Sequence, residues 1–180
     1  MLRAPEYYMA LALAQASHAL DIGEIPVGAV VVDADGAVVG AGCNETLTSH
    51  DPSAHAEMVA LRKAALALSN YRLPGLSMYV TLEPCPMCTG LLIHARLKHL
   101  WFGTPDPRTG ACGSVFSLIG DPRHNHHVEV SGGILQDECS KILKDFFKLR
   151  RAQAKALNAK RIAPLVSPLK ILDGTTVLQK

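Results

Sequence analysis

The fold is decided by SMYVTLEPCPMC, residues 77–88, in which an apolar run leads directly to two cysteines. The run over residues 77–82 is typical of a buried strand. Proline is tolerated in the first turn of a helix, so we expect a helix from Pro86 to about Leu97. Cys85 and Cys88 should then lie on one face of the start of that helix.

Helices and strands are predicted to alternate along the rest of the chain. We expect helices over residues 6–22, from a cap at Ser53 through Leu68, and over residues 137–158, and strands over residues 27–32, 37–40, 100–102 and 128–130. This alternation indicates an α/β protein with helices on both faces of one sheet.

Length and composition favour one globular domain. The chain has 180 residues and 48% hydrophobic content, and we expect a single domain over residues 1–160 and a mobile tail over residues 161–180. No apolar run reaches the ~20 residues that span a bilayer, and no secretory leader is visible, so we expect a cytoplasmic protein with no membrane partner. Five cysteines without a framework spacing indicate reduced thiols or metal ligands.

Charge is distributed unevenly. Residues 141–180 contain ten Lys or Arg and two Asp or Glu, a net charge of +8, which leaves −6 on residues 1–140. Phe146 and Phe147 precede Lys148, Arg150 and Arg151. Aromatic rings that stack on bases, beside cations that hold phosphates, are typical of RNA-binding surfaces. The alternative is a solvated helix followed by a basic tail.

A metal site is predicted from the HAE triplet at residues 55–57 together with the two cysteines. His55, Cys85 and Cys88 supply three zinc ligands, and three protein ligands with an open position are typical of catalytic zinc, whereas structural zinc takes four. Such a zinc lowers the pKa of its bound water to about 7. Glu57 lies two residues beyond the histidine and can carry the proton. We therefore expect one zinc ion per chain.

The remaining cysteines and histidines have simpler interpretations. Cys43, Cys112 and Cys139 form no second Cys-x-x-Cys pair, so we expect them to be small buried residues. The HNHH stretch at residues 124–127 is expected to be a solvated segment and not a second metal site.

His-x-Glu followed by Pro-Cys-x-x-Cys resembles the signature of the zinc-dependent nucleobase deaminases. Within that superfamily of cytidine and deoxycytidylate deaminases, residues 5–155 are similar to the bacterial tRNA-specific adenosine deaminases. The similar stretches are residues 25–29, 50–57, 70–73, 79–85, 102–103, 106, 109–110, 125–126, 145–147 and 150–151.

The resemblance implies a three-layer α/β/α fold around a mixed sheet of about five strands. It also implies hydrolytic deamination of adenosine to inosine at the wobble position of a tRNA anticodon, by a homodimer whose active site lies near the subunit interface. The zinc would be held by His55, Cys85 and Cys88, and Glu57 would be the general acid and base.

The resemblance also implies a set of substrate contacts. Asn44 would contact the flipped nucleotide, and the backbone N–H of Ala56 would steady the oxygen on the zinc. Asp106 would touch the RNA backbone, and Asn125 would help to line the pocket. Phe147, Arg150 and Arg151 belong to the segment that would hold the anticodon loop.

Two other functions remain open at this point. The same chemistry could act on a free nucleobase or nucleoside such as guanine or cytidine, although such a substrate needs no basic, aromatic helix. A zinc-stabilised RNA-binding module without turnover is the second alternative, but a structural site has no use for an unliganded carboxylate such as that of Glu57.

Overall fold

A computed structural model describes residues 3–162 of the 180, with side chains described to residue 158. Nine regular elements are present in that range. The strands are β1 (Gly28–Val32), β2 (Val38–Cys43), β3 (Ser77–Leu82), β4 (His99–Thr104) and β5 (Glu129–Gly132), and the helices are α1 (Pro5–Asp21), α2 (Ala56–Ala67), α3 (Pro86–His94) and α4 (Gln136–Ile162).

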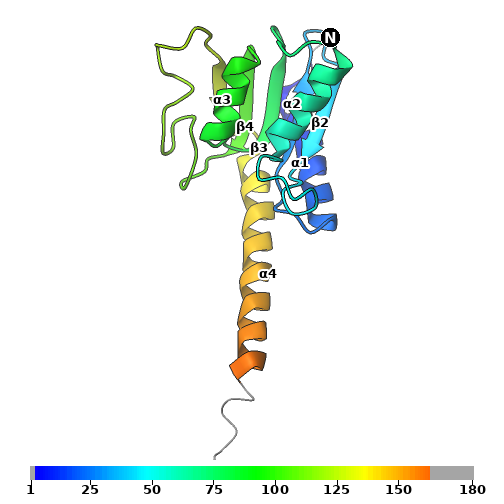
Figure 1. The fold of residues 1–180 in the computed structure, drawn as a ribbon, viewed down its shortest axis with the longest axis vertical. Helices are drawn as coiled ribbons and strands as arrows, with labels where there is room; N and C mark the ends of the chain where they lie inside the picture. Colours follow the sequence, from blue (N-terminus) through cyan, green and yellow to red (C-terminus); the bar gives the residue numbers. More distant parts are fainter. Residues whose placement is uncertain (1–2, 163–180) are drawn as a thin grey trace, which may run out of the picture. The chain divides into compact units, whose positions relative to one another are not determined.

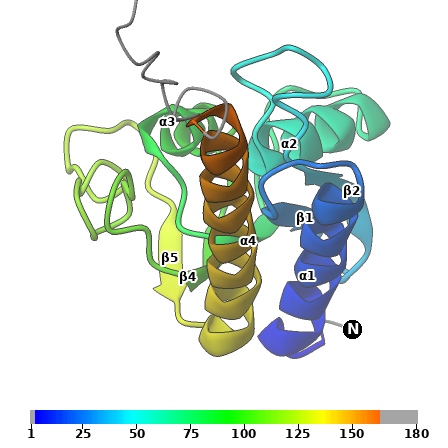
Figure 2. The same cartoon turned by 90° about the horizontal axis from the view of Figure 1, so that it is seen from below.

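The five strands form one mixed sheet in the order β2-β1-β3-β4-β5. β1 pairs antiparallel with β2 and with β3, whereas β3 and β4, and β4 and β5, pair parallel. A parallel pair needs a crossover, and α3 supplies it between β3 and β4. Figures 1 and 2 show α2 and α3 on one face of the sheet and α1 on the other. The predicted α/β class and the mixed five-stranded sheet are therefore confirmed.

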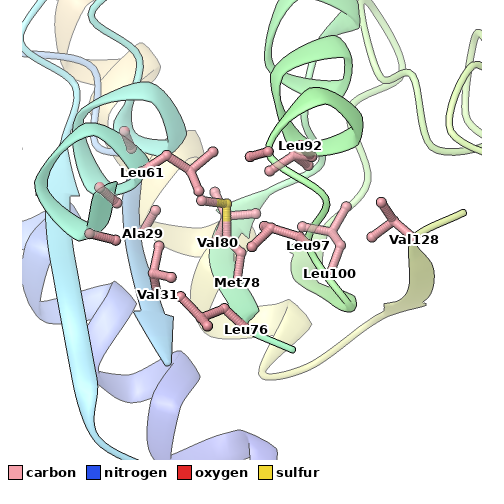
Figure 3. Packing of buried hydrophobic residues seen from close by; sticks show 14 of the residues in the cluster. Ala29, Val31, Leu61, Leu76, Met78, Val80, Leu92, Leu97, Leu100 and Val128 are labelled. Atoms are coloured by element: carbon pink, nitrogen blue, oxygen red, sulfur yellow. The ribbon is translucent and has the colours of Figure 1, made fainter. Parts of the chain in front are cut away.

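The central strands β1 and β3 are buried on both faces of the sheet, which explains their apolar character. Val31 of β1 and Met78 and Val80 of β3 pack toward α2 and α3, as Figure 3 shows around Leu61 and Leu92. Val30, Val32 and Tyr79, which alternate with them, pack against α1 on the opposite face. Side chains on successive strand residues point to opposite faces, so an unbroken apolar run is what a strand covered on both sides requires.

The two helices beside the candidate metal ligands have boundaries that differ from those expected. α2 begins at Ala56 and not after a cap at Ser53, because the Ser53 N–H and hydroxyl both donate to Asp51 Oδ1, at 2.8 and 2.7 Å. His55 consequently occupies the N-cap position, one residue outside the helix. α3 ends at His94 and not near Leu97, because Arg96 adopts a left-handed φ of 59°.

The remaining elements differ from expectation by a few residues only. β2 and β4 run to Cys43 and Thr104, each beyond its predicted end, and α4 continues to Ile162. None of the helices within residues 3–162 is both long enough and apolar enough to cross a bilayer.

The chain divides into two units between Phe146 and Phe147, within α4. The sheet, α1 to α3 and the first turns of α4 belong to the first unit. The expected boundary between a domain over residues 1–160 and a tail over residues 161–180 stays a prediction, and residues 163–180 of that tail lie outside the described residues.

Candidate metal centre

Three predicted ligands come together where two helices begin. His55 is the N-cap residue of α2, Cys85 is the N-cap residue of α3, and Cys88 lies in the first turn of α3. The Nδ1 atom of His55 lies 3.7 Å from Cys85 Sγ and 3.6 Å from Cys88 Sγ. All three ligand atoms lie within 4.8 Å of one another.

These separations fit a tetrahedral zinc ion. With Zn–S near ~2.3 Å and Zn–N near ~2.0–2.1 Å, a nitrogen and a sulfur at two corners of a tetrahedron lie about 3.6 Å apart. Within residues 3–162, no other group of three His, Cys, Asp or Glu residues has this arrangement. His124 and His126 instead place Nε2 against the carbonyl oxygens of Leu118 and Leu97, at 2.9 and 2.6 Å.

The local electrostatics prepare Cys85 to bind a cation. A hydrogen bond from the Cys88 thiol lowers the pKa of Cys85 to about 4, against the effect of burial, and contact with His55 lowers it further. The same contact with Cys85 raises the pKa of His55, although burial acts in the opposite direction. Because the thiolate is the metal-binding form of cysteine, this site offers one ligand already deprotonated at neutral pH.

Glu57 lies in the first turn of α2 and is only 4% exposed. Burial raises the pKa of its carboxyl group above the ordinary value of 4.5, with its own backbone N–H and the charge of His55 opposing the change. A general acid and base works best when its pKa lies close to the working pH. The position and environment of Glu57 therefore suit proton transfer beside the three ligands.

Asn44 and Ala56 lie in direct contact. Asn44 follows β2, is 7% exposed, and accepts the Ala56 N–H at its Oδ1 atom, at 2.9 Å. Only the amide oxygen can accept from an N–H group, so this bond also decides which side of the amide carries the Nδ2 donors. Ala56 adjoins His55, so Asn44 and Ala56 both lie next to the three candidate ligands. The predicted role of the Ala56 N–H toward an oxygen on the metal stays a prediction.

Asp106 lies in the loop that follows β4. Its N–H donates to Glu83 Oε2 at 3.0 Å, and its carboxylate accepts the Arg108 N–H at 2.9 Å and the Thr109 hydroxyl at 2.6 Å. Glu83 is two residues before Cys85, so the structure places this loop beside the segment that carries two of the ligands.

Asn125 lies beside the C-terminal half of α3. Asn125 lines a surface hollow of about 340 Å³ with His94 and Arg123. Its carbonyl oxygen accepts from Arg96, just beyond the end of α3 that is remote from Cys85. Its predicted part in the substrate pocket stays a prediction.

Phe147, Arg150 and Arg151 lie in the second unit of the chain. All three side chains are exposed, Phe147 by 41%. An exposed aromatic side chain followed by exposed guanidinium groups is compatible with RNA binding. Their predicted contacts with the anticodon loop stay predictions.

Two buried carboxylates were not identified from the sequence. Glu24 and Glu83 are 0% and 2% exposed, and each accepts hydrogen bonds from a loop next to the ligand cluster. The only feature of the sequence that could have indicated their burial is that each is a single acidic residue next to an apolar strand segment. A buried acidic residue needs partners, but the sequence does not say which backbone groups supply them.

Comparison with known proteins shows the family to which the chain is similar. Residues 2–104 match the family described as the cytidine and deoxycytidylate deaminase zinc-binding region. The chain is 48% identical over 150 residues to the tRNA-specific adenosine deaminase of Haemophilus influenzae, an alignment that covers 83% of this chain and 87% of that protein.

Two solved structures extend the comparison. One comes from studies of A-to-I editing by tRNA:A34 deaminases at the wobble position of transfer RNA, with a TM-score of 0.73, 40% identity, and coverage of 76% of this chain and 99% of that chain. The other is guanine deaminase from Bacillus subtilis, with a TM-score of 0.56, 31% identity, and coverage of 83% and 95%.

Proposed function

The chain belongs to the cytidine and deoxycytidylate deaminase family, and from that premise we propose that it hydrolyses adenosine to inosine at the wobble position of tRNA anticodons, releasing ammonia. The observation that carries the chemistry is the cluster of His55, Cys85 and Cys88 with the buried Glu57 beside it. The substrate is inferred from 48% identity to a tRNA-specific adenosine deaminase.

The residues of the site have separate roles in the proposed reaction. When bound by His55, Cys85 and Cys88, zinc supplies Lewis acidity that makes water a nucleophile near neutral pH. Glu57 takes a proton from the attacking water at its carboxylate and gives it to N1 of the adenine ring. The carboxylate then carries the second proton to the departing amine, so that adenosine and water yield inosine and ammonia.

Asn44 is placed to orient the base. Its Oδ1 atom is held by the Ala56 N–H, so its Nδ2 donors are directed by a fixed amide and not by a freely rotating one. A buried donor of this kind is well placed to hold a nucleotide that has been flipped out of its stack, because base-modifying enzymes read the extruded base by hydrogen bonds.

We assign contacts with RNA phosphates and bases to α4, and a separate contact with the RNA backbone to the loop that bears Asp106. Arg150 and Arg151 would hold phosphates and Phe147 would stack on a base, in a segment whose charge is strongly positive. Asp106 would contact the sugar-phosphate backbone next to the flipped nucleotide. The proposed enzyme is a cytoplasmic homodimer with one zinc ion in each subunit and tRNA as its macromolecular partner.

The alternative substrate is a free base, because guanine deaminase from Bacillus subtilis has the same fold and 31% identity to this chain. The higher identity to a tRNA-specific relative and the basic α4 favour tRNA. A zinc-stabilised module without turnover is disfavoured by the burial of Glu57 beside the ligands.

A substrate comparison tests the proposal. The protein is incubated with an anticodon stem-loop that carries a wobble adenosine, with the same stem-loop carrying guanosine there, and with free guanine, cytidine and adenosine. We expect inosine from the first RNA only, detected by mass spectrometry of the digested nucleosides, together with stoichiometric ammonia. If the protein deaminates one of the free compounds but not the stem-loop, that compound and not tRNA is its substrate.

A further inference from the structure

Glu83 is a buried carboxylate that none of the proposed chemical steps uses. It lies between the end of β3 and Pro84, and its side chain is 2% exposed. Its Oε1 atom accepts the N–H groups of Cys112 and Ser114, at 2.9 and 3.1 Å. Its Oε2 atom accepts the Asp106 N–H at 3.0 Å and the Ser114 hydroxyl.

The partners of this carboxylate are almost entirely backbone groups of one loop. No ion pair within residues 3–162 includes Glu83, so its partners are these hydrogen-bond donors. A buried carboxylate is tolerated when several hydrogen bonds satisfy it, and bonds to a charged acceptor are stronger than bonds to a neutral one. The loop over residues 105–114 therefore folds around the carboxylate.

Neighbouring backbone bonds tie the same loop to the ligand segment. The Glu83 N–H donates to Thr104 O at 2.9 Å, and the Ala111 N–H donates to Pro84 O at 2.9 Å. Gly110 closes the arrangement, because a Cβ atom there would lie 2.5 Å from both Cδ and Oε2 of Glu83. The carboxylate and the loop consequently leave no room for a side chain between them.

We propose that Glu83 is a positioning residue that holds the loop carrying Asp106 against the segment carrying Cys85 and Cys88. One carboxylate fixes Asp106 by its backbone, while the carboxylate of Asp106 shapes the next turn through Arg108 and Thr109. The distance between a contact on the RNA backbone and the metal ligands is then set by Glu83. This last step rests on the proposed function, whereas the positioning of the loop does not.

Glu83→Gln tests the proposal, because the amide keeps the shape but turns an NH₂ group toward backbone donors. Hydrogen–deuterium exchange of residues 105–114 is measured with zinc content, and kcat and KM are measured on the wobble-adenosine stem-loop. We expect exchange in the loop to accelerate at least roughly tenfold. KM should rise by a similar factor, with zinc retained and kcat changed less than about threefold.

Two further variants make the result specific. Ser114→Ala removes only the hydroxyl bond, so it should accelerate exchange in the same loop by a smaller factor and remains informative if Glu83→Gln does not fold. Glu129→Gln neutralises an exposed carboxylate on β5 and should leave loop exchange and KM unchanged. In an Asp106→Ala background, Glu83→Gln should add little to KM, because both changes act on the same contact.

The possible outcomes test the role of Glu83 separately from the proposed deamination of tRNA. Unchanged exchange in residues 105–114, or loss of zinc together with kcat, would overturn the positioning of the loop by Glu83. Faster exchange with an unaltered KM would overturn the further step, in which Glu83 sets the distance between the RNA contact and the metal ligands. If the wild-type protein does not deaminate the stem-loop, the proposed function fails. Exchange and zinc content then decide by themselves whether Glu83 positions the loop.

Discussion

At the scale of single residues, Glu57 provides the sharpest test of the proposed chemistry. Glu57→Gln keeps the size and shape of the side chain but removes its capacity to carry protons. We expect zinc content and RNA affinity to stay unchanged while turnover of the stem-loop falls at least ~10²-fold, the lower range for a positioned acid and base. Single-turnover kinetics measures the loss. A variant that loses its metal and recovers its rate when zinc is resupplied would make Glu57 a structural residue.

The three ligands lead to a separate prediction about metal removal. A strong chelator should abolish activity, and one equivalent of zinc per chain should restore it, because three protein ligands with one open position define a single catalytic site. Elemental analysis before and after treatment measures the stoichiometry. Cys88→Ser is the matched variant, and it should hold zinc much more weakly because a hydroxyl replaces a thiolate. Two firmly bound zinc ions per chain would contradict the prediction.

The meeting of His55, Cys85 and Cys88 was predictable from the sequence, and the hydrogen-bond partners of the buried Glu83 were not. The spacing of His55, Cys85 and Cys88 is a local pattern that a helix start explains. Glu83 gains its partners from residues 23 to 31 positions later, through backbone N–H groups that every residue type carries. No side-chain pattern marks such a contact before the fold is known.

At the scale of elements, Glu24 holds the loop after β2. Its carboxylate is 0% exposed and accepts the N–H groups of Leu47 and Thr48, at 2.7 and 2.8 Å, and the hydroxyls of Thr46 and Thr48. Burial raises the pKa of Glu24, but these hydrogen bonds together lower it below its ordinary value of 4.5. Asn44, the candidate nucleotide contact, lies at the start of this loop.

This lowered pKa predicts how stability changes with pH. A carboxyl group with a lower pKa in the folded state stabilises the fold above its unfolded pKa, and that contribution is lost as the pH falls through the folded pKa. Glu24→Gln should therefore lower the free energy of unfolding by about 1–3 kcal/mol at pH 7. The difference from wild type should shrink as the pH falls below about 4.5.

Urea unfolding between pH 7 and pH 3 measures this difference. Glu129→Gln is the control, because it removes the same charge from an exposed position, where an ion pair contributes only about 0–1 kcal/mol. A Glu24→Gln deficit that stays constant across the whole pH range would show that ionised Glu24 does not stabilise the loop.

Element types were predicted more successfully than the point at which α2 begins. Ser53 and His55 are both reasonable starts for a helix by sequence, and Asp51 decides between them because it takes both Ser53 donors. The consequence is functional, since His55 outside the helix can turn its ring toward the cysteines of α3. Local competition for hydrogen bonds, which propensity does not resolve, sets this boundary.

At the scale of the whole molecule, the layers followed from the alternation of elements, but the strand order did not. A crossover through α3 requires β3 and β4 to be parallel, whereas nothing in the apolar pattern says that β1 pairs with both β2 and β3. The homodimer likewise stays a proposal, which only the family resemblance of the sequence implies. Its direct measurement is the mass of the particle in solution.

Charge is the other property of the whole chain, and it leads to the last prediction. Replacing Arg150 and Arg151 with alanine should weaken binding of the anticodon stem-loop most at low salt, because each phosphate contact releases counterions. Each lost contact should flatten the log–log dependence of affinity on salt by roughly one unit or less. Zinc content and turnover of saturating substrate should be unaffected, since the exposed guanidinium groups are not metal ligands.

Truncation after Ala163 is the matched comparison for this test. It removes only Lys170 and Lys180 among the basic residues, so the proposal assigns it a small effect on affinity. Binding constants of the wild type, the double arginine variant and the truncated protein across a salt series separate the two segments. If truncation costs as much affinity as the double variant, or if the double variant binds like wild type, Arg150 and Arg151 do not hold the RNA phosphates. That result would favour a free base as the substrate, because a free base needs no phosphate contacts.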